Sequence, residues 1–221
     1  MLKPVRVALE VGRARTFATA LDWPGWCRSG KSEDATIEAL LAYAPRYGAV
    51  VAGITPRFIV PRPGPPVEVV ERLAGNASTE FGAPGVPPAA DNAPVDTRDL
   101  RRLGSIMEAC WSAFDRTVAG AVGLTLRTGP RGGGRDLDTI RGHADEADRA
   151  YLARLGGRVG KDANHTAVRA AFLEALGARA RGEVADVGPR GGKRWSARFA
   201  VRYAAWHTLD HAWEIEDRAQ A

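Results

Sequence analysis

The chain has 221 residues, of which 45% are hydrophobic and 26% are charged, a composition that argues against a disordered or fibrous protein. The formal net charge is +5, but acidic and basic residues are interspersed, so we do not expect a nucleic acid partner. Two cysteines without a CxxC pattern, and the lack of a signal-like or membrane-spanning apolar run, predict a cytoplasmic protein without disulfides or membrane contact.

The first part of the chain predicts short strands and one helix. Residues 32–43 carry an apolar stripe at helical spacing behind a Ser N-cap and two acidic residues, which predicts a helix. Short runs of apolar and β-branched residues, bounded by Gly, Pro and Asp, indicate strands on both sides of this helix. The expected strands are residues 5–11, 16–21, 58–60 and 67–70.

Before that helix, residues 25–32 fit the G-x-x-x-x-G-K-[ST] pattern of a phosphate-binding loop. A nucleotide hydrolase also needs an acidic residue at the end of a later apolar strand, where it organises Mg²⁺. The best later apolar run, residues 48–54, ends in Thr55 and Pro56 instead. We therefore interpret residues 25–32 as a turn between a strand and a helix.

The same stretch carries a second pattern. Residues 17–26 read Phe-Ala-Thr-Ala-Leu-Asp-Trp-Pro-Gly-Trp, and a Ser-Gly pair and a Glu-containing apolar helix follow. This order of a strand, an Asp-x-Pro-Gly turn, a Gly-containing segment and a helix resembles the small HicB-like αβ domain over residues 5–60. The resemblance implies a β-β-α-β fold, which we assign to residues 1–74, and a role as an interaction module.

Proline crowding separates this region from the rest of the chain. Ten of the 14 prolines lie between Pro45 and Pro94, and Gly, Pro, Ala and Asn dominate residues 75–97, which we interpret as a linker. Helical periodicity then predicts a four-helix bundle over residues 98–221. The expected helices are residues 99–122, 137–155, 164–179 and 196–218. The expected fold class is therefore α+β with two domains.

A short sequence, Gly-Pro-Arg-Gly-Gly, precedes two of these helices, at residues 129–133 and 188–192. It records either a duplicated helix pair or a shared preference for a Gly-rich helix entry. The two copies share one end of the bundle only if the second and fourth helices are parallel. Because free N–H groups and basic residues attract anions at a helix start, Arg190 and Arg194 are a candidate anion site. Salt bridges to neighbouring helices are the alternative explanation for the basic residues.

Histidines provide the strongest chemical pattern. His207 and His211 are four residues apart, so both rings leave one face of the last helix, on the same stripe as Phe199 and Tyr203. His143 lies on the apolar stripe of the second helix, so a bundle can bring all three rings together in its core. The ring nitrogens of three inward imidazoles are difficult to provide with hydrogen-bond partners without an ion. We therefore predict a metal site at His143, His207 and His211. We expect His165, at the start of the third helix, to lie on the surface.

Residues 205–218 read Ala-Trp-His-Thr-Leu-Asp-His-Ala-Trp-Glu-Ile-Glu-Asp-Arg, which resembles the final-helix signature of the DinB-like superfamily. Residues 135–155, with Ile-x-x-His, resemble the second helix of that superfamily, and the resemblance extends over residues 98–218. It implies a four-helix metalloprotein in which His143, His207 and His211 hold a divalent ion, commonly zinc or nickel. It also implies a thiol S-transferase or a related enzyme that activates a thiol or water.

Two acidic residues follow the histidines. Asp210 and Glu214 are the candidate catalytic residues, either as acceptors for imidazole N–H groups or as proton shuttles, and a solvent-facing role is the alternative. The expected partner is a small-molecule substrate such as a low-molecular-weight thiol, and the chain could form a homodimer. A non-catalytic binding or regulatory protein, with a structural metal and a HicB-like recognition module, is the alternative function.

Overall fold

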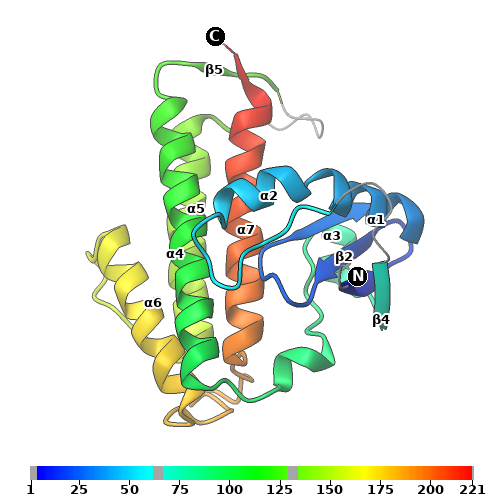
Figure 1. Cartoon of the computed structure of the whole chain (residues 1–221). Coiled ribbons are helices and arrows are strands. Elements are labelled where there is room, and N and C mark those ends of the chain that lie inside the picture. The colour runs from blue at the N-terminus through cyan, green and yellow to red at the C-terminus, as the bar shows by residue number, and fades with distance from the viewer. Residues whose placement is uncertain (1–3, 62–66, 129–133, 221) are drawn as a thin grey trace.

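The computed structural model describes residues 4–61, 67–128 and 134–220, and over these ranges a four-stranded sheet lies beside a group of long helices (Figure 1). The fold is therefore mixed α and β, as the sequence predicts. None of the helices in these ranges is long and apolar enough to cross a membrane.

The sheet has the strand order β3-β2-β1-β4, with β1 and β4 parallel and the other pairs antiparallel. Its strands are β1 (Val5–Val11), β2 (Thr16–Ala20), β3 (Cys27–Gly30) and β4 (Val67–Ala74). The first two strands are confirmed, and β4 is longer than expected. The expected strand at residues 58–60 is wrong, because this segment pairs with no strand and instead buries Phe58.

Residues 25–32, expected to be a turn, form a tight turn followed by the short strand β3. Residues Cys27–Gly30 pair with β2, so their backbone is part of the sheet, and the Ser32 side chain caps the helix that follows. Gly25 adopts a φ of 93°, and a Cβ atom there would lie 3.0 Å from the Cβ of Ala205. Glycine thus lets this turn lie close to the last helix.

Two helices, α1 (Glu33–Ala42) and α2 (Ala44–Val50), follow β3 and bury an aromatic cluster. In this cluster the Trp26 ring stacks on Tyr47 at 5.8 Å, and Phe58 packs edge-on against both rings. The Trp26 indole N–H donates to the Leu40 carbonyl, and the Tyr47 hydroxyl donates to the Pro24 carbonyl. These bonds satisfy the two polar groups that burial takes out of water.

The segment 75–97, expected to be a linker, contains α3 (Ala77–Phe81) and a 3₁₀ turn, η1 (Ala89–Asn92). Glu10 of β1 is buried and accepts bonds from the Thr79 hydroxyl and from the backbone N–H groups of Gly85 and Val86. Burial raises the pKa of the Glu10 carboxyl, and these bonds oppose that effect. The segment is thus attached to the sheet at several points.

Four long helices form the second part of the structure, and each begins at a side-chain cap. They are α4 (Thr97–Gly120), α5 (Leu137–Leu155), α6 (His165–Ala180) and α7 (Ala197–Arg218), with caps from Asp96, Asp136, Asn164 and Ser196. A short pair, β5 (Thr125–Leu126) with β6 (Ala219–Gln220), lies beyond the end of α7. All four expected helices are present, with ends shifted by at most two residues.

The helices α5 and α7 are antiparallel. Tyr151, late in α5, packs on Tyr203, early in α7, whereas His143, early in α5, packs on His211, late in α7. The two helices therefore start at opposite ends of the group (Figure 1). The Gly-Pro-Arg-Gly-Gly copy at residues 129–133 lies outside the described residues, and the copy at 188–192 is a turn closed by Gly188 and Gly192.

The helix α7 joins the sheet to the other helices. Its Trp206 ring packs against Phe17 of β2 at 6.1 Å, and most of its 22 residues are buried. One hydrophobic cluster runs from the strands through α1 and α2 into α4, α6 and α7. Residues that represent this shared core include Leu9, Trp26, Tyr47, Met107, Phe172 and Ala205. The sheet and the long helices therefore share a core.

Candidate metal centre

The three predicted histidines lie together between α5 and α7. His207 and His211 leave one face of α7, and His143 of α5 lies opposite them. Their ring centroids are 4.5 to 5.1 Å apart. One nitrogen from each ring lies within 4.8 Å of the others, which is close enough to hold one metal ion. Helical spacing and antiparallel packing together produce this cluster.

Nε2 of His143 lies 3.2 Å from Nε2 of His207. Two ligands of a tetrahedral zinc ion, each about 2.0–2.1 Å from the metal, stand about 3.3 Å apart. A direct N–H···N hydrogen bond between two neutral rings fits the same distance. The distance of this pair is therefore compatible with a metal, and the third ring decides between the two arrangements.

In the third ring, that of His211, one nitrogen already has a hydrogen-bond partner outside the cluster. Nδ1 of His211 lies 2.8 Å from a carboxylate oxygen of Glu214, and because a carboxylate only accepts, Nδ1 carries the proton. The lone pair of Nε2 is then free for a ligand bond. Glu214 in turn accepts from Arg218, which also donates to the Arg127 and Arg135 carbonyls. This arrangement fits a metal ligand, since metal-binding histidines commonly donate their other N–H to a carboxylate.

Two of the rings, His143 and His207, are held in the neutral form that metal binding requires. Burial, reinforced by the neighbouring imidazoles, lowers the pKa of His207 to about 2. Burial and the charge of His211 also lower the pKa of His143. The Glu214 pKa falls to about 2, chiefly because its carboxylate accepts from His211. The site thus combines two neutral imidazoles, His143 and His207, with the ionised carboxylate of Glu214.

The surroundings leave one side of the cluster open. His211 is buried, His207 is half-buried and His143 is exposed, so the cluster extends from the core to the surface. The Tyr151 ring lies edge-on to His207 at 5.5 Å and forms part of an aromatic wall. The other members of this wall are Trp195, Phe199, Tyr203 and Trp206. His143 is therefore the most solvent-exposed ring of the cluster.

The two candidate catalytic residues occupy different places. Glu214 contacts His211 directly, as described above. Asp210 forms an ion pair with Arg28 of β3 at 3.1 Å, and the Arg28 guanidinium lies 3.9 Å from the centre of the Tyr43 ring. Asp210 therefore connects α7 to the sheet rather than to an imidazole. No short sequence pattern indicates this pairing, because Arg28 and Asp210 are 182 positions apart.

The candidate anion residues lie away from the histidines. Arg190 is exposed in the turn before α7, and Arg194 donates to the Ala185 carbonyl. Arg194 lies before the start of α7 at Ala197, and His207 lies ten helical positions after that start, which is roughly 15 Å along the axis. His165 is exposed at the first position of α6. These residues do not join the histidine cluster.

Basic residues near the start of α7 and acidic residues near its end form ion pairs. Near its start, Arg198 pairs with Asp99 and Arg202 pairs with Asp91. Near its end, Glu216 and Asp217 both pair with Arg46 of α2. The salt-bridge explanation therefore applies to these charges.

Comparison with protein-family models, curated proteins and solved structures finds no match for the chain. The DinB-like and HicB-like resemblances stay predictions that rest on the residues quoted for them.

Proposed function

We propose that the chain is a metal-dependent enzyme of the DinB-like type, in which His143, His207 and His211 bind one divalent ion, either zinc or nickel. The observation that carries this proposal is the convergence of three imidazoles from two helices, with the Nδ1 proton of His211 held by Glu214. Neutral imidazole nitrogens suit both ions. Two ligands on one turn of α7 and one on α5 would also fix the ion to a rigid part of the fold.

The proposed reaction is the transfer of a low-molecular-weight thiol to an electrophile, or a related reaction of thiol or water. A divalent ion with three neutral ligands, when bound, lowers the pKa of a water or thiol in its remaining position toward neutrality. Glu214 would keep the proton on Nδ1 of His211 and so hold the ring in the ligand tautomer. The exposed position of His143 would admit the substrate.

We also propose that residues 98–218 are the DinB-like bundle and residues 5–60 a HicB-like module. Four capped helices support the first assignment, and the β1–β2–β3 sheet followed by α1 supports the second. The module would then act on the site through α7, because Arg28 of β3 pairs with Asp210, one residue before His211.

A thiol titration of the cobalt-substituted protein tests whether the site is open to substrate. Cobalt(II) in an open three-histidine site should accept a thiol, and a thiolate-to-cobalt absorption band should appear in the wild type. The band should be absent in His207→Ala. A cobalt spectrum that no thiol changes would contradict the enzyme proposal and favour the non-catalytic alternative with a structural metal.

The reaction itself is tested with a panel of cellular thiols and a chlorinated nitroaromatic acceptor. We expect thiol transfer by the metal-loaded protein, and loss of transfer after metal stripping or in His143→Ala. Equal rates with and without metal would contradict the proposal.

A further inference from the structure

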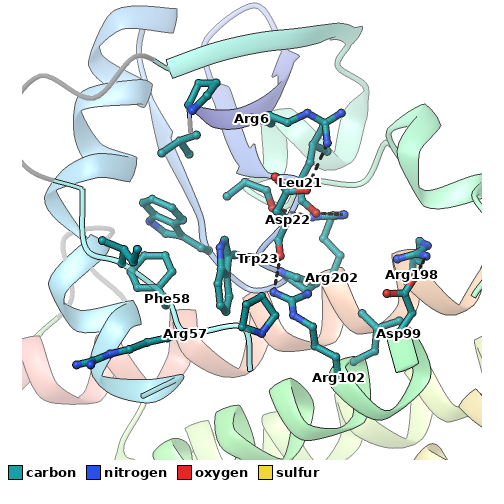
Figure 2. Close-up of a pocket in the computed structure, with 18 of the residues that line it drawn as sticks. Arg6, Leu21, Asp22, Trp23, Arg57, Phe58, Asp99, Arg102, Arg198 and Arg202 are labelled. Atoms are coloured by element: carbon teal, nitrogen blue, oxygen red, sulfur yellow. Dashed lines mark hydrogen bonds and ion pairs between the residues drawn. The ribbon is translucent and has the colours of Figure 1, made fainter. Parts of the chain in front are cut away.

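A cavity lies between the N-terminal sheet and the long helices, and its lining contains none of the three histidines (Figure 2). Its volume of about 900 Å³ is within the range of small-molecule sites. The end of β2 with its following turn, the segment 56–61, the start of α4 and the start of α7 form its walls. Arg202 of α7 lines this cavity, and five helical positions place it about 140° around the helix from His207.

Arginines outnumber acidic residues in the lining of this cavity. Three of the arginines are balanced, since Arg6 pairs with Asp22, Arg198 with Asp99, and Arg202 with Asp91 behind the wall. The third aspartate in the lining, Asp96, caps α4 through its side chain. Arg57, Arg98 and Arg102 also line the cavity, and none of the three has an ion pair within the described residues. The cavity is therefore positively charged.

Arg102 is the most confined of these positive charges. Its Nη2 donates to the backbone carbonyl of Asp22 at 2.7 Å, and its Nε is buried without a hydrogen-bond partner in the described structure. Burial lowers the pKa of its guanidinium, which means that the surroundings do not fully compensate the charge. An anion in the cavity would compensate this charge by pairing with the other nitrogens of the guanidinium, since the buried Nε is out of its reach.

Aromatic rings lie beside this guanidinium. The Arg102 carbon lies 4.5 Å from the centre of the Trp23 ring, and Trp23 packs edge-on against Phe58 at 5.0 Å. Figure 2 shows Trp23 between Phe58 and Arg102 on one side of the cavity. Trp23 is only half-buried, so part of its ring faces the open space. The cavity thus offers a planar apolar surface next to a cation.

We propose that this cavity is a second ligand site, for a small organic anion that carries a phosphate or carboxylate on a planar ring. The charged group pairs with Arg102, the ring packs against Trp23 and Phe58, and Arg98 attracts the anion at the exposed rim. The site is independent of the histidine cluster, so it stands whether or not the chain binds a metal.

Calorimetric titration with four probes tests the site. Phenyl phosphate and benzoate carry both features and distinguish the two anionic groups, inorganic phosphate carries only the charge, and phenol carries only the ring. In 0.15 M salt we expect at least one of the two ring anions to bind the wild type more tightly than inorganic phosphate or phenol. No binding of either ring anion, or equal binding of inorganic phosphate, would overturn the proposal.

Matched variants locate the binding. Arg102→Gln should weaken the bound ring anion by about tenfold or more, because one charge-assisted pair is lost. Arg101→Gln removes the same charge from an exposed position on the same helix outside the lining, and should leave binding unchanged. Equal affinity in Arg102→Gln and wild type would overturn the proposal.

Two further variants guard against indirect effects. Arg98→Gln changes an exposed rim residue without an ion pair in the described structure, and it should weaken binding severalfold even if Arg102→Gln does not fold. His207→Ala should leave binding of the ring anion unchanged. A loss of binding in His207→Ala with no effect of Arg98→Gln would place the anion at the histidines and overturn the second site.

Discussion

Glu214 fixes the tautomer of His211, and at the scale of single residues this contact decides how well the cluster can hold an ion. The carboxylate accepts from Nδ1 of His211 and from Arg218. Replacement by Gln keeps the shape but removes the negative charge. We expect Glu214→Gln to weaken metal binding by about 10- to 100-fold, as is typical when such a partner is lost. Competition with a chelator measures the effect.

The control for this substitution is Glu174→Gln, at an exposed position of α6 outside the cluster. It removes the same charge and should leave the metal affinity unchanged. Equal affinities in Glu214→Gln and Glu174→Gln would show that Glu214 does not support a metal ligand.

A second residue-scale prediction concerns Asp148 of α5, which is 5% exposed. Burial raises its pKa to about 6, although Arg169 of α6 lies 3.5 Å away and lowers it. Asp145 on the same helix raises it further, and Asp115 of α4 pairs with Arg169. The folded protein therefore binds a proton on Asp148 more tightly than the unfolded chain does.

The sign of the pH effect follows from this raised pKa. The contribution of Asp148 to the free energy of unfolding is therefore fully present below about pH 4, where the carboxyl is protonated in both states, and it is lost as the pH rises through about 6. For a pKa raised by about two units, the loss is roughly 3 kcal/mol. Asp148→Asn should therefore gain stability relative to wild type over that range. Urea unfolding of both proteins from pH 4 to 7.5 measures the difference, and a constant difference across the range would contradict the prediction.

The histidine cluster could be predicted from sequence because the necessary pattern is local. Two histidines four positions apart share a helix face, and the apolar stripe of α5 places His143 toward the same core. The partner of Asp210 and the buried charge of Arg102 could not be predicted. Both depend on how the turn after β2 and the strand β3 approach the long helices, and no short sequence pattern encodes that approach.

At the scale of elements, the ion pair of Arg202 with Asp91 attaches η1 to α7. Both side chains are buried, and Arg202 also donates to the carbonyls of Ala20 and Leu21 at the end of β2. Loss of the carboxylate would leave a buried, unpaired guanidinium. We expect Asp91→Ala to lower the free energy of unfolding by about 3 kcal/mol or more, the usual cost of breaking a buried pair from one side.

A double substitution separates the pair from its packing. Asp91→Leu combined with Arg202→Met removes both charges and keeps apolar volume, so it should cost less than Asp91→Ala alone. Denaturant unfolding provides the comparison. If the double variant is less stable than Asp91→Ala, the unpaired buried charge is not the cause of the stability that Asp91→Ala loses.

The long helices were predictable because their signals are carried within each segment. Amphipathic periodicity and side-chain caps define α4 to α7 without reference to the rest of the chain. The strand β3 was missed because its four residues include Arg28 and Ser29, and only pairing with β2 makes it a strand. The strand expected at residues 58–60 was wrong because its apolar character does not come from a sheet. Phe58 instead packs in the aromatic cluster against Trp26 and Tyr47.

At the scale of the whole molecule, one hydrophobic cluster joins the sheet to the long helices. Composition separates two regions at the proline-rich segment, but composition does not report that Trp26, Tyr47 and the residues of α4 and α7 belong to one hydrophobic cluster. Such a core predicts a single cooperative unfolding transition.

Denaturant unfolding with two probes tests this cooperativity. Far-UV circular dichroism, which reports mostly the helices, and tryptophan fluorescence should give the same midpoint. Trp26→Phe near the sheet and Phe172→Leu in α6 should both shift that one transition to lower denaturant. Two separate transitions, each moved by only one of the substitutions, would contradict the shared core.

The metal content of the purified protein tests the central claim most directly. Wild-type protein expressed with zinc and nickel available, then dialysed, should contain close to one ion per chain by elemental mass spectrometry. The variants His143→Ala and His207→Ala, folded by circular dichroism, should contain far less, while His165→Ala, at the exposed start of α6, should match the wild type. A wild type without metal, or equal metal content in all four proteins, would contradict a metal centre at His143, His207 and His211.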